Sequence, residues 1–199
     1  MADMEKTGKN LEGRGFRVHR FASGAEAADY LVQTLHGTSI GIGGSVTIDT
    51  LGVYDCLCES NEVFWHWKNH APETRERAGK AETYLCSANG VSENGEIVNI
   101  DGFGNRVAGT IYGPERVFLV VGRNKIAPDL TGAIDRARNI AAPLNARRLN
   151  RHTPCAMGEP RCHDCRSPEK VCGVMTVFFM PPTSIKEFHV ILVDEDLGY

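Results

Sequence analysis

The chain has 199 residues, of which 42% are hydrophobic and 24% are charged, and its formal net charge is −3 at pH 7. This composition is that of a globular protein, and the length suits one sizeable core, so we expect a single α/β domain over residues 1–199. The slightly acidic balance argues against nucleic-acid binding, and no stretch approaches the roughly 20 apolar residues of a membrane span. The polar, mixed-charge start does not resemble a secretion signal, and we therefore expect a cytoplasmic protein with no membrane insertion.

The N-terminal half of the chain is expected to alternate helices and strands. A helix is predicted over residues 24–36, because Ser23 and Glu26 have the spacing of a capping box and apolar residues recur at helical intervals. A short apolar strand over residues 39–42 leads into a glycine-rich loop. The other expected elements of this half are a helix over 48–57, a strand over 63–67, a loop or partly helical excursion over 68–79 and a strand over 82–86.

The C-terminal half contains the clearest strand–helix unit. Residues 117–121 are continuously apolar, so both faces of this strand should be covered, and the helix after it opens at Pro128 and is predicted to end at Pro143. Asn94 and Gly95 predict a type I′ hairpin turn. The other expected elements are a helix over 106–112 and strands over 97–100, 174–179 and 188–193. Together they predict a mainly parallel sheet covered by helices, with an inserted hairpin and an irregular C-terminal cysteine segment.

Four polar loops leave the ends of predicted strands. They span residues 41–47, 87–90, 101–105 and 122–125. The ends of parallel strands share one edge of a sheet, so we predict a crevice in which loop N–H groups, Arg123 and Lys125 bind a small anion. Each glycine taken singly could instead merely turn the chain. The candidate ligand-binding residues are Gly41, Gly43, Gly44, Ser45, Thr47, Asn89, Asn99, Gly102, Gly104, Asn105, Arg123 and Lys125.

Two carboxylates and a basic run accompany these loops. Asp49 and Asp101 are the candidate catalytic acid–base residues, but Asp49 could equally be an early-helix charge and Asp101 could fix its turn by hydrogen bonds. The first loop carries no NAD or flavin fingerprint, because Val46 replaces the third glycine. The basic run, which could bind a phosphate or form a solvated helix face, consists of Arg136, Arg138, Arg147, Arg148 and Arg151.

Four of the seven cysteines crowd into residues 152–173. Their spacing is Cys155-x6-Cys162-x2-Cys165-x6-Cys172, and proline and glycine residues make the segment loop-like. Four thiolates can hold a metal centre, which would be zinc or an iron–sulfur cluster; the alternative is free thiols or a disulfide. The spacing does not separate the two metals. We interpret the other cysteines as small core residues, namely Cys56, Cys58 and Cys86.

Several stretches resemble the LUD-domain (lactate utilisation) family over most of the chain. These stretches are GIGGSVT (41–47), VNIDGFGNR (98–106), VVGRNK (120–125) and VILVDEDLGY (190–199), and PLNARRLN (143–150) with the cysteine segment is similar to a stand-alone subgroup. The resemblance implies the NagB/RpiA/CoA transferase-like fold shared by sugar-phosphate isomerases, CoA transferases and formyltetrahydrofolate cyclo-ligases. It also implies a role in lactate oxidation beside iron–sulfur oxidoreductase subunits.

Two functional hypotheses follow, and the sequence leaves open whether the protein is an enzyme. In the first, the protein acts on or binds a small anionic metabolite, such as a hydroxy acid like lactate, an acyl-CoA or a sugar phosphate. An iron–sulfur cluster in the cysteine segment would then make oxidation chemistry coherent. In the second, the protein is a non-catalytic ligand-binding or assembly subunit with a structural zinc site. A homo-oligomer is compatible with either hypothesis.

Overall fold

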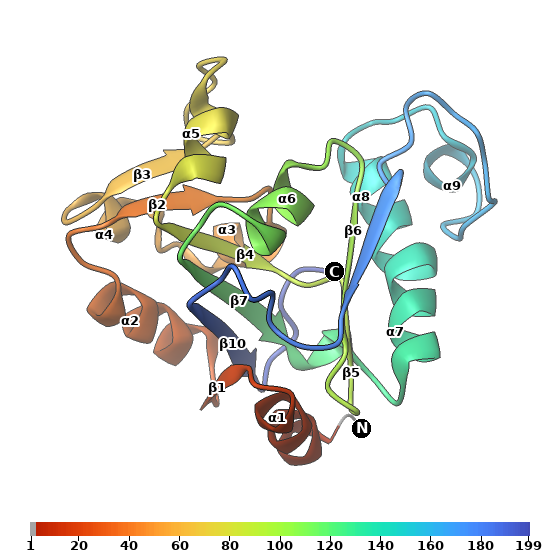
Figure 1. Cartoon of the computed structure of the whole chain (residues 1–199). Coiled ribbons are helices and arrows are strands. Elements are labelled where there is room, and N and C mark those ends of the chain that lie inside the picture. The colour runs from red at the N-terminus through yellow and green to blue at the C-terminus, as the bar shows by residue number, and fades with distance from the viewer. Residues whose placement is uncertain (1–2) are drawn as a thin grey trace.

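The computed structural model describes residues 3–199, in two sheets with surrounding helices (Figure 1). The main sheet has six parallel strands in the order β1-β10-β7-β4-β2-β3, and the second sheet has the order β8-β5-β6-β9. The main strands are β1 (Arg17–Phe21), β2 (Ser39–Ile42), β3 (Glu62–Trp65), β4 (Thr83–Ser87), β7 (Arg116–Gly122) and β10 (Glu187–Val193). The second sheet contains β5 (Gly90–Ser92), β6 (Ile97–Asp101), β8 (Ile126–Ala127) and β9 (Val174–Phe178). The predicted α/β fold with a mainly parallel sheet is confirmed.

Helices cover both sheets. They are α1 (Met4–Gly13), α2 (Gly24–Thr34), α3 (Val46–Leu51), α4 (Tyr54–Cys58), α5 (Thr74–Lys80), α6 (Asn105–Ile111), α7 (Leu130–Arg136), α8 (Ala142–Arg148) and α9 (Pro154–Met157). A 3-10 turn (Arg123–Lys125) follows β7, and a π-helical turn (Ala137–Ala141) joins α7 to α8. Among residues 3–199, no helix combines the length and apolar character needed to cross a membrane.

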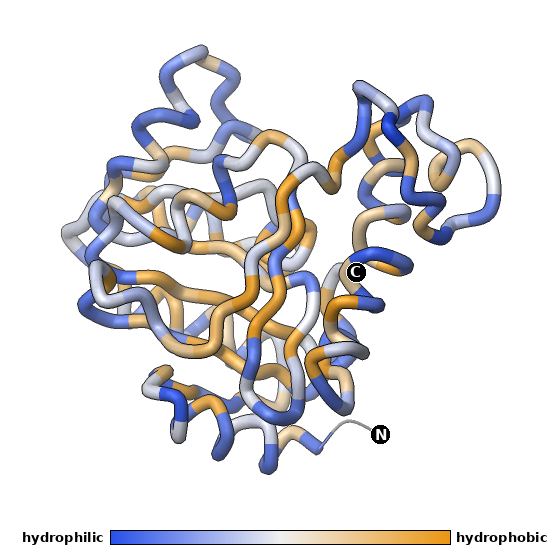
Figure 2. Tube along the Cα trace, turned by 45° about the vertical axis from the view of Figure 1, so that its right-hand side comes forward, coloured by the Kyte–Doolittle hydropathy of each residue, from blue (hydrophilic) through white to orange (hydrophobic). Residues whose placement is uncertain are grey.

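Alternating side chains of the central strands build a core on each face of the main sheet. Val117, Leu119 and Val121 of β7 belong to one buried cluster, whereas Phe118 and Val120 belong to the other. This two-sided burial is what the continuously apolar stretch predicted. A third cluster lies between β6 and the helices α7 and α8. Hydrophobic residues concentrate on the strands, whereas the cysteine-rich segment is largely polar (Figure 2).

The predicted capping box begins α2. The Ser23 side chain accepts a hydrogen bond from Glu26 N at 3.2 Å, and the Glu26 carboxylate accepts one from Ala22 N at 2.9 Å. The predicted helix over 48–57 is instead two short helices, α3 and α4, because Gly52 adopts the left-handed conformation (φ 67°) between them. The predicted excursion at 68–79 contains α5.

Two local predictions are wrong. Asn94 lacks the positive φ that a type I′ turn requires, and Gly95 alone takes it (φ 90°), so the hairpin closes through a three-residue loop whose ends are joined by a bond from Ser92 N to Glu96 O. The predicted helix end at Pro143 is also wrong. The π-helical turn carries the helix past this proline, which lies in the first turn of α8, where its missing N–H costs little.

Two elements near the N-terminus, α1 and β1, have no counterpart in the predicted elements. β1 is an edge strand of the main sheet, and none of its five residues is fully buried. Its sequence, RVHRF, therefore lacks the clean apolar alternation of a half-buried strand. The two closing strands were predicted correctly as strands, but they belong to different sheets, β9 pairing with β6 and β10 with β1 and β7.

Candidate functional site

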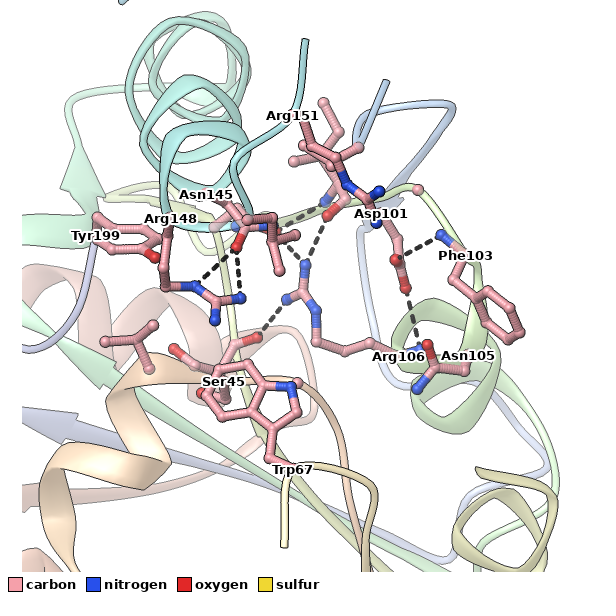
Figure 3. A pocket seen from close by; sticks show the side chains of 18 of the residues that line it. Ser45, Trp67, Asp101, Phe103, Asn105, Arg106, Asn145, Arg148, Arg151 and Tyr199 are labelled. Carbon is pink, nitrogen blue, oxygen red and sulfur yellow. Dashed lines mark hydrogen bonds between the residues drawn. The ribbon is translucent and has the colours of Figure 1, made fainter. Parts of the chain in front are cut away.

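A cavity of about 750 Å³ opens where the loops after several strands meet. Its walls come from Gly44–Thr47 after β2, Trp67 after β3, Ser87–Asn89 after β4, Asp101–Phe103 at the end of β6, and Lys125 after β7. The end of α8 contributes the opposite wall, with Arg148 and the residues that follow it (Figure 3). The carboxyl edge of a parallel sheet is the usual ligand site of such folds. The cavity therefore lies at the edge of the sheet that the loop pattern predicts.

The structure brings most, but not all, of the candidate residues to this cavity. Those that line it are Gly44, Ser45, Thr47, Asn89, Asp101, Gly102, Asn105 and Lys125. Those that do not line it are Gly41, Gly43, Asp49, Asn99, Gly104 and Arg123. His70 and Arg75, from the excursion at 68–79, lie on its wall, so that part of the chain borders the cavity.

The three glycines that do not line the cavity allow close packing or an unusual backbone conformation. At Gly41, an added Cβ would lie 2.0 Å from the carbonyl oxygen of Ala78, so this glycine permits close packing of β2 against α5. At Gly43, it would lie 3.0 Å from the Tyr84 hydroxyl. Gly104 has φ 95° and precedes α6.

Asp49 and Arg123 are held by surface ion pairs away from the cavity lining. Asp49 lies 3.3 Å from the Lys68 ammonium. Arg123 pairs with Asp196 at 3.0 Å and with Asp194 at 3.5 Å. The charge of Arg123 is thus neutralised beside the C-terminal strand, and the guanidinium is not free to bind an anion in the cavity.

Arg106, which was absent from the candidate residues, holds the cavity loops together. Its Nη1 donates to Ser87 O and Asn99 Oδ1, both at 2.9 Å, and its Nη2 donates to Asn89 Oδ1 and Ile100 O, both at 2.6 Å. Asn99, fully buried, therefore positions Arg106 rather than touching the cavity itself. The polar residues at the ends of two buried strands indicated a buried hydrogen-bond network. No feature of the sequence indicated that Arg106 donates its hydrogen bonds.

Asp101 both lines the cavity and fixes the start of α6. Its carboxylate accepts hydrogen bonds from the backbone N–H groups of Phe103 (3.2 Å) and Arg106 (3.0 Å), which Figure 3 shows, and from that of Val107 (3.2 Å). This is the turn-fixing arrangement that we considered beside a catalytic role.

Lys125 is the most deeply buried cation at the cavity wall, with 2% of the residue exposed. Its Nζ donates to the hydroxyls of Thr47 at 2.7 Å and Ser87 at 2.8 Å, and it forms no ion pair within residues 3–199. Burial, reinforced by the charges of Arg136 and Arg106, holds the pKa of Lys125 well below its usual range.

Positive charge dominates the cavity. Its basic residues are Arg75, Arg106, Lys125, Arg148, Arg151 and Lys170, against the carboxylates Asp101 and Glu169. None of these six cations belongs to an ion pair in the part of the chain that the structure describes. Trp67 adds an aromatic wall, and the guanidinium of Arg148 lies over its ring at 4.5 Å. Arg148 and Arg151 come from the basic run, so this run is not only a solvated face.

The four clustered cysteines line a second cavity of about 300 Å³. All seven cysteines are free thiols, and Cys162 Sγ accepts hydrogen bonds from Arg138 Nη2 (3.3 Å) and Asp164 N (3.4 Å). Within residues 3–199, no group of three or more His, Cys, Asp or Glu side chains converges on the position of a single ion. The two cavities share a wall formed by Ile100, Lys170 and Val171. Of the remaining cysteines, Cys86 is buried as predicted, but Cys56 and Cys58 are exposed on α4, so the core interpretation is wrong for these two.

The sequence matches the LUD domain over residues 4–193. The chain belongs to the LUD-domain family. A crystal structure of a DUF162 family protein from Deinococcus radiodurans is similar to this LUD domain with a TM-score of 0.56 at 12% sequence identity, covering 96% of this chain and 95% of that chain. At this identity the likeness shows a shared fold and carries no residue roles. A search of curated proteins found no match to the chain.

Proposed function

We propose that this LUD-domain protein binds a small anionic metabolite in the larger cavity and acts on it, with a hydroxy acid such as lactate as the first candidate. The observation that carries the proposal is the gathering of arginines without ion pairs at this cavity, of which Arg75, Arg148 and Arg151 are exposed. Thirteen of the chain's 22 Lys and Arg side chains form ion pairs with Asp or Glu elsewhere. Charges of one sign around a concave site attract and retain ligands of the opposite sign.

The six cations do not have the same role in this proposal. Arg106 already uses four of its five N–H groups on the cavity loops, so it positions the walls and has only Nε–H to spare. Arg75, Arg148 and Arg151 are exposed at the cavity wall, and they are the side chains free to meet an anion. Trp67 also lines the cavity, and the Arg148 guanidinium lies over its ring.

A matched pair of variants on α5 tests the proposal. Arg75 lines the cavity, whereas Arg77 on the same helix pairs with Glu62 at 2.6 Å and does not line it. Isothermal titration calorimetry with lactate, inorganic phosphate and coenzyme A would measure affinity for each ligand class. We expect Arg75→Gln to bind the accepted anion about ten-fold more weakly and Arg77→Gln to bind it as the wild type does. Binding of none of the three ligands, or equal effects of the two variants, would refute the proposal.

We also propose that Cys155, Cys162, Cys165 and Cys172 hold an iron–sulfur cluster. The four thiols line one cavity of about 300 Å³, and a set of four cysteines is a ligand set that iron–sulfur clusters use. A bound cluster would accept and pass on electrons, which makes oxidation of a hydroxy acid and electron transfer to iron–sulfur oxidoreductase subunits coherent.

Metal analysis tests this second proposal. The protein would be purified without oxygen, its visible spectrum recorded, and its iron, sulfide and zinc measured. We expect iron and sulfide in the wild type and in Cys58→Ser, which changes an exposed cysteine outside the segment, and their loss in Cys162→Ser. One zinc per chain would instead support the assembly subunit with a structural metal site. A protein that holds neither metal would refute the metal centre.

A further inference from the structure

Anion binding by the exposed arginines makes no use of the buried amine of Lys125. This residue is 2% exposed, yet it lines the larger cavity. The thiol beside it provides no counter-charge at neutral pH, because burial raises the pKa of Cys86 to about 12. Arg136 and Arg106 are its charged neighbours, and both disfavour a further positive charge. A desolvated lysine next to other cations is a recognised form of activated nucleophile.

The hydrogen bonds around Lys125 match those of a neutral amine. Thr47 Oγ1 donates its own hydrogen to Leu197 O at 3.2 Å, and Ser87 Oγ donates to Ala88 O at 3.3 Å. Both oxygens therefore act as acceptors toward Nζ, at 2.7 and 2.8 Å. An ammonium group has three N–H donors, whereas a neutral amine has two and a lone pair. Two acceptors satisfy the neutral amine and leave its lone pair available to the cavity.

We propose that Lys125 is a nucleophile that forms an imine with the carbonyl carbon of a 2-oxo acid held in this cavity. The amine attacks the carbonyl carbon to give a carbinolamine. The carbonyl oxygen then leaves as water with the two amine hydrogens, and a C=N bond replaces the C=O bond without any oxidant or reductant. The inference rests on the proposed anion site, because the unpaired cations would hold the ligand's carboxylate. A 2-oxo acid is also the product class of 2-hydroxy acid oxidation, so the two proposals concern the same site.

Reductive trapping tests the imine. The full-length protein would be incubated with pyruvate or glyoxylate and sodium cyanoborohydride, which converts an imine to a stable secondary amine, and then analysed by intact mass and peptide mapping. We expect one adduct per chain, mapped to Lys125 in the wild-type protein. Lys125→Arg should lose the adduct, and Lys68→Arg, which changes a lysine outside the lining of this cavity, should retain it.

Peptide mapping of the wild type keeps the test decisive even if Lys125→Arg does not fold. Adducts on Lys170 or spread over surface lysines, or no adduct at Lys125 with either oxo acid, would overturn the imine. Calorimetry with pyruvate distinguishes this failure from failure of the anion site. Pyruvate that binds without forming an adduct refutes the nucleophile alone, whereas pyruvate that does not bind also counts against the site.

Discussion

At the scale of single residues, the cavity is organised by side chains that use most of their hydrogen-bonding groups within the protein. Arg106 joins the loops after β4 and β6, and Asp101 accepts three backbone N–H bonds at the start of α6. Lys125 differs because its two partners are neutral hydroxyls and no carboxylate neutralises it. The residues that fix the shape of the cavity therefore differ from the residue that could react with a ligand.

The two candidate catalytic carboxylates should differ sharply in their effect on stability. Asp101→Ala removes the acceptor of three backbone N–H groups, and we expect it to lower the free energy of unfolding by about 1–2 kcal/mol. Asp49→Ala removes a half-exposed ion pair with Lys68, and we expect a change below about 0.5 kcal/mol. Urea denaturation measures both. Equal losses would show that the hydrogen bonds of Asp101 contribute little.

At the scale of elements, the position of α5 depends on a glycine in the neighbouring strand. An added Cβ at Gly41 would overlap the Ala78 carbonyl, whereas one at Gly79, within α5, would meet nothing within 4 Å. Because α5 also carries Arg75, this contact between β2 and α5 sets one wall of the cavity.

Alanine substitutions at these two glycines should have opposite effects. We expect Gly41→Ala to lower the free energy of unfolding by about 1–3 kcal/mol through overpacking. Gly79→Ala should raise it by about 0.5–1 kcal/mol, since alanine favours the helix more than glycine does. Thermal and urea denaturation would measure both changes. If Gly41→Ala left the free energy of unfolding unchanged, α5 would be able to move away from β2 at little energetic cost.

The pairing of β1 with β10 places two histidines side by side, His189 buried and His19 half-buried. His19 Nε2 and His189 Nδ1 are 2.9 Å apart, and the His189 ring stacks on Phe118 at 4.2 Å. Burial lowers the pKa of both imidazoles, with the charge of Arg17 acting in the same direction and the Glu187 carboxylate opposing it at His189. Tyr30 completes the cluster through its hydroxyl, 3.1 Å from His19.

These lowered pKa values predict a loss of stability in mild acid. Below the ordinary histidine pKa of about 6.5, the unfolded chain binds protons that the folded chain does not, so the free energy of unfolding falls as the pH decreases. Urea denaturation between about pH 7.5 and about pH 5.5 would show this decline, and His189→Phe should reduce its slope. An unchanged slope in the variant would assign the decline to other groups.

At the scale of the whole molecule, the two cavities are neighbours with common walls. Ile100 lies at the end of β6, and Lys170 and Val171 belong to the cysteine segment, yet all three line both cavities. An added Cβ at Gly102 would lie 2.7 Å from Val171 Cα, which shows how closely the segment packs on the cavity loop. Order in the cysteine segment and the shape of the anion cavity should therefore be coupled.

If the cysteine segment holds the proposed cluster, its removal should weaken anion binding as well as destabilise the segment. The segment is largely polar and has little core of its own, so binding of a metal by its cysteines would organise it. We expect the chelated protein and Cys162→Ser to melt at a lower temperature and to bind the anion several-fold more weakly, by calorimetry, than Cys58→Ser. If the affinity for the anion were unchanged after metal loss, the wall shared by the two cavities would not couple the cysteine segment to anion binding.

Elements with local signals could be predicted from the amino-acid sequence alone. The apolar run of β7 required two covered faces, the capping box set the start of α2, and polar loops after strands indicated the edge of the sheet where the larger cavity lies. Edge strand β1 and the continuation of the helix past Pro143 escaped prediction, because their stability comes from neighbours or from a π-helical turn that no local pattern marks.

Only the tertiary structure decided which charges are free to act. Arg123 and Lys125 are two residues apart in one loop, and the sequence treats them alike. In the folded chain, Arg123 lies between Asp194 and Asp196, whereas Lys125 is buried against Thr47 and Ser87. The partners of each lie 38 to 78 residues away along the chain, so the fold, and no local pattern, sets the state of each charge.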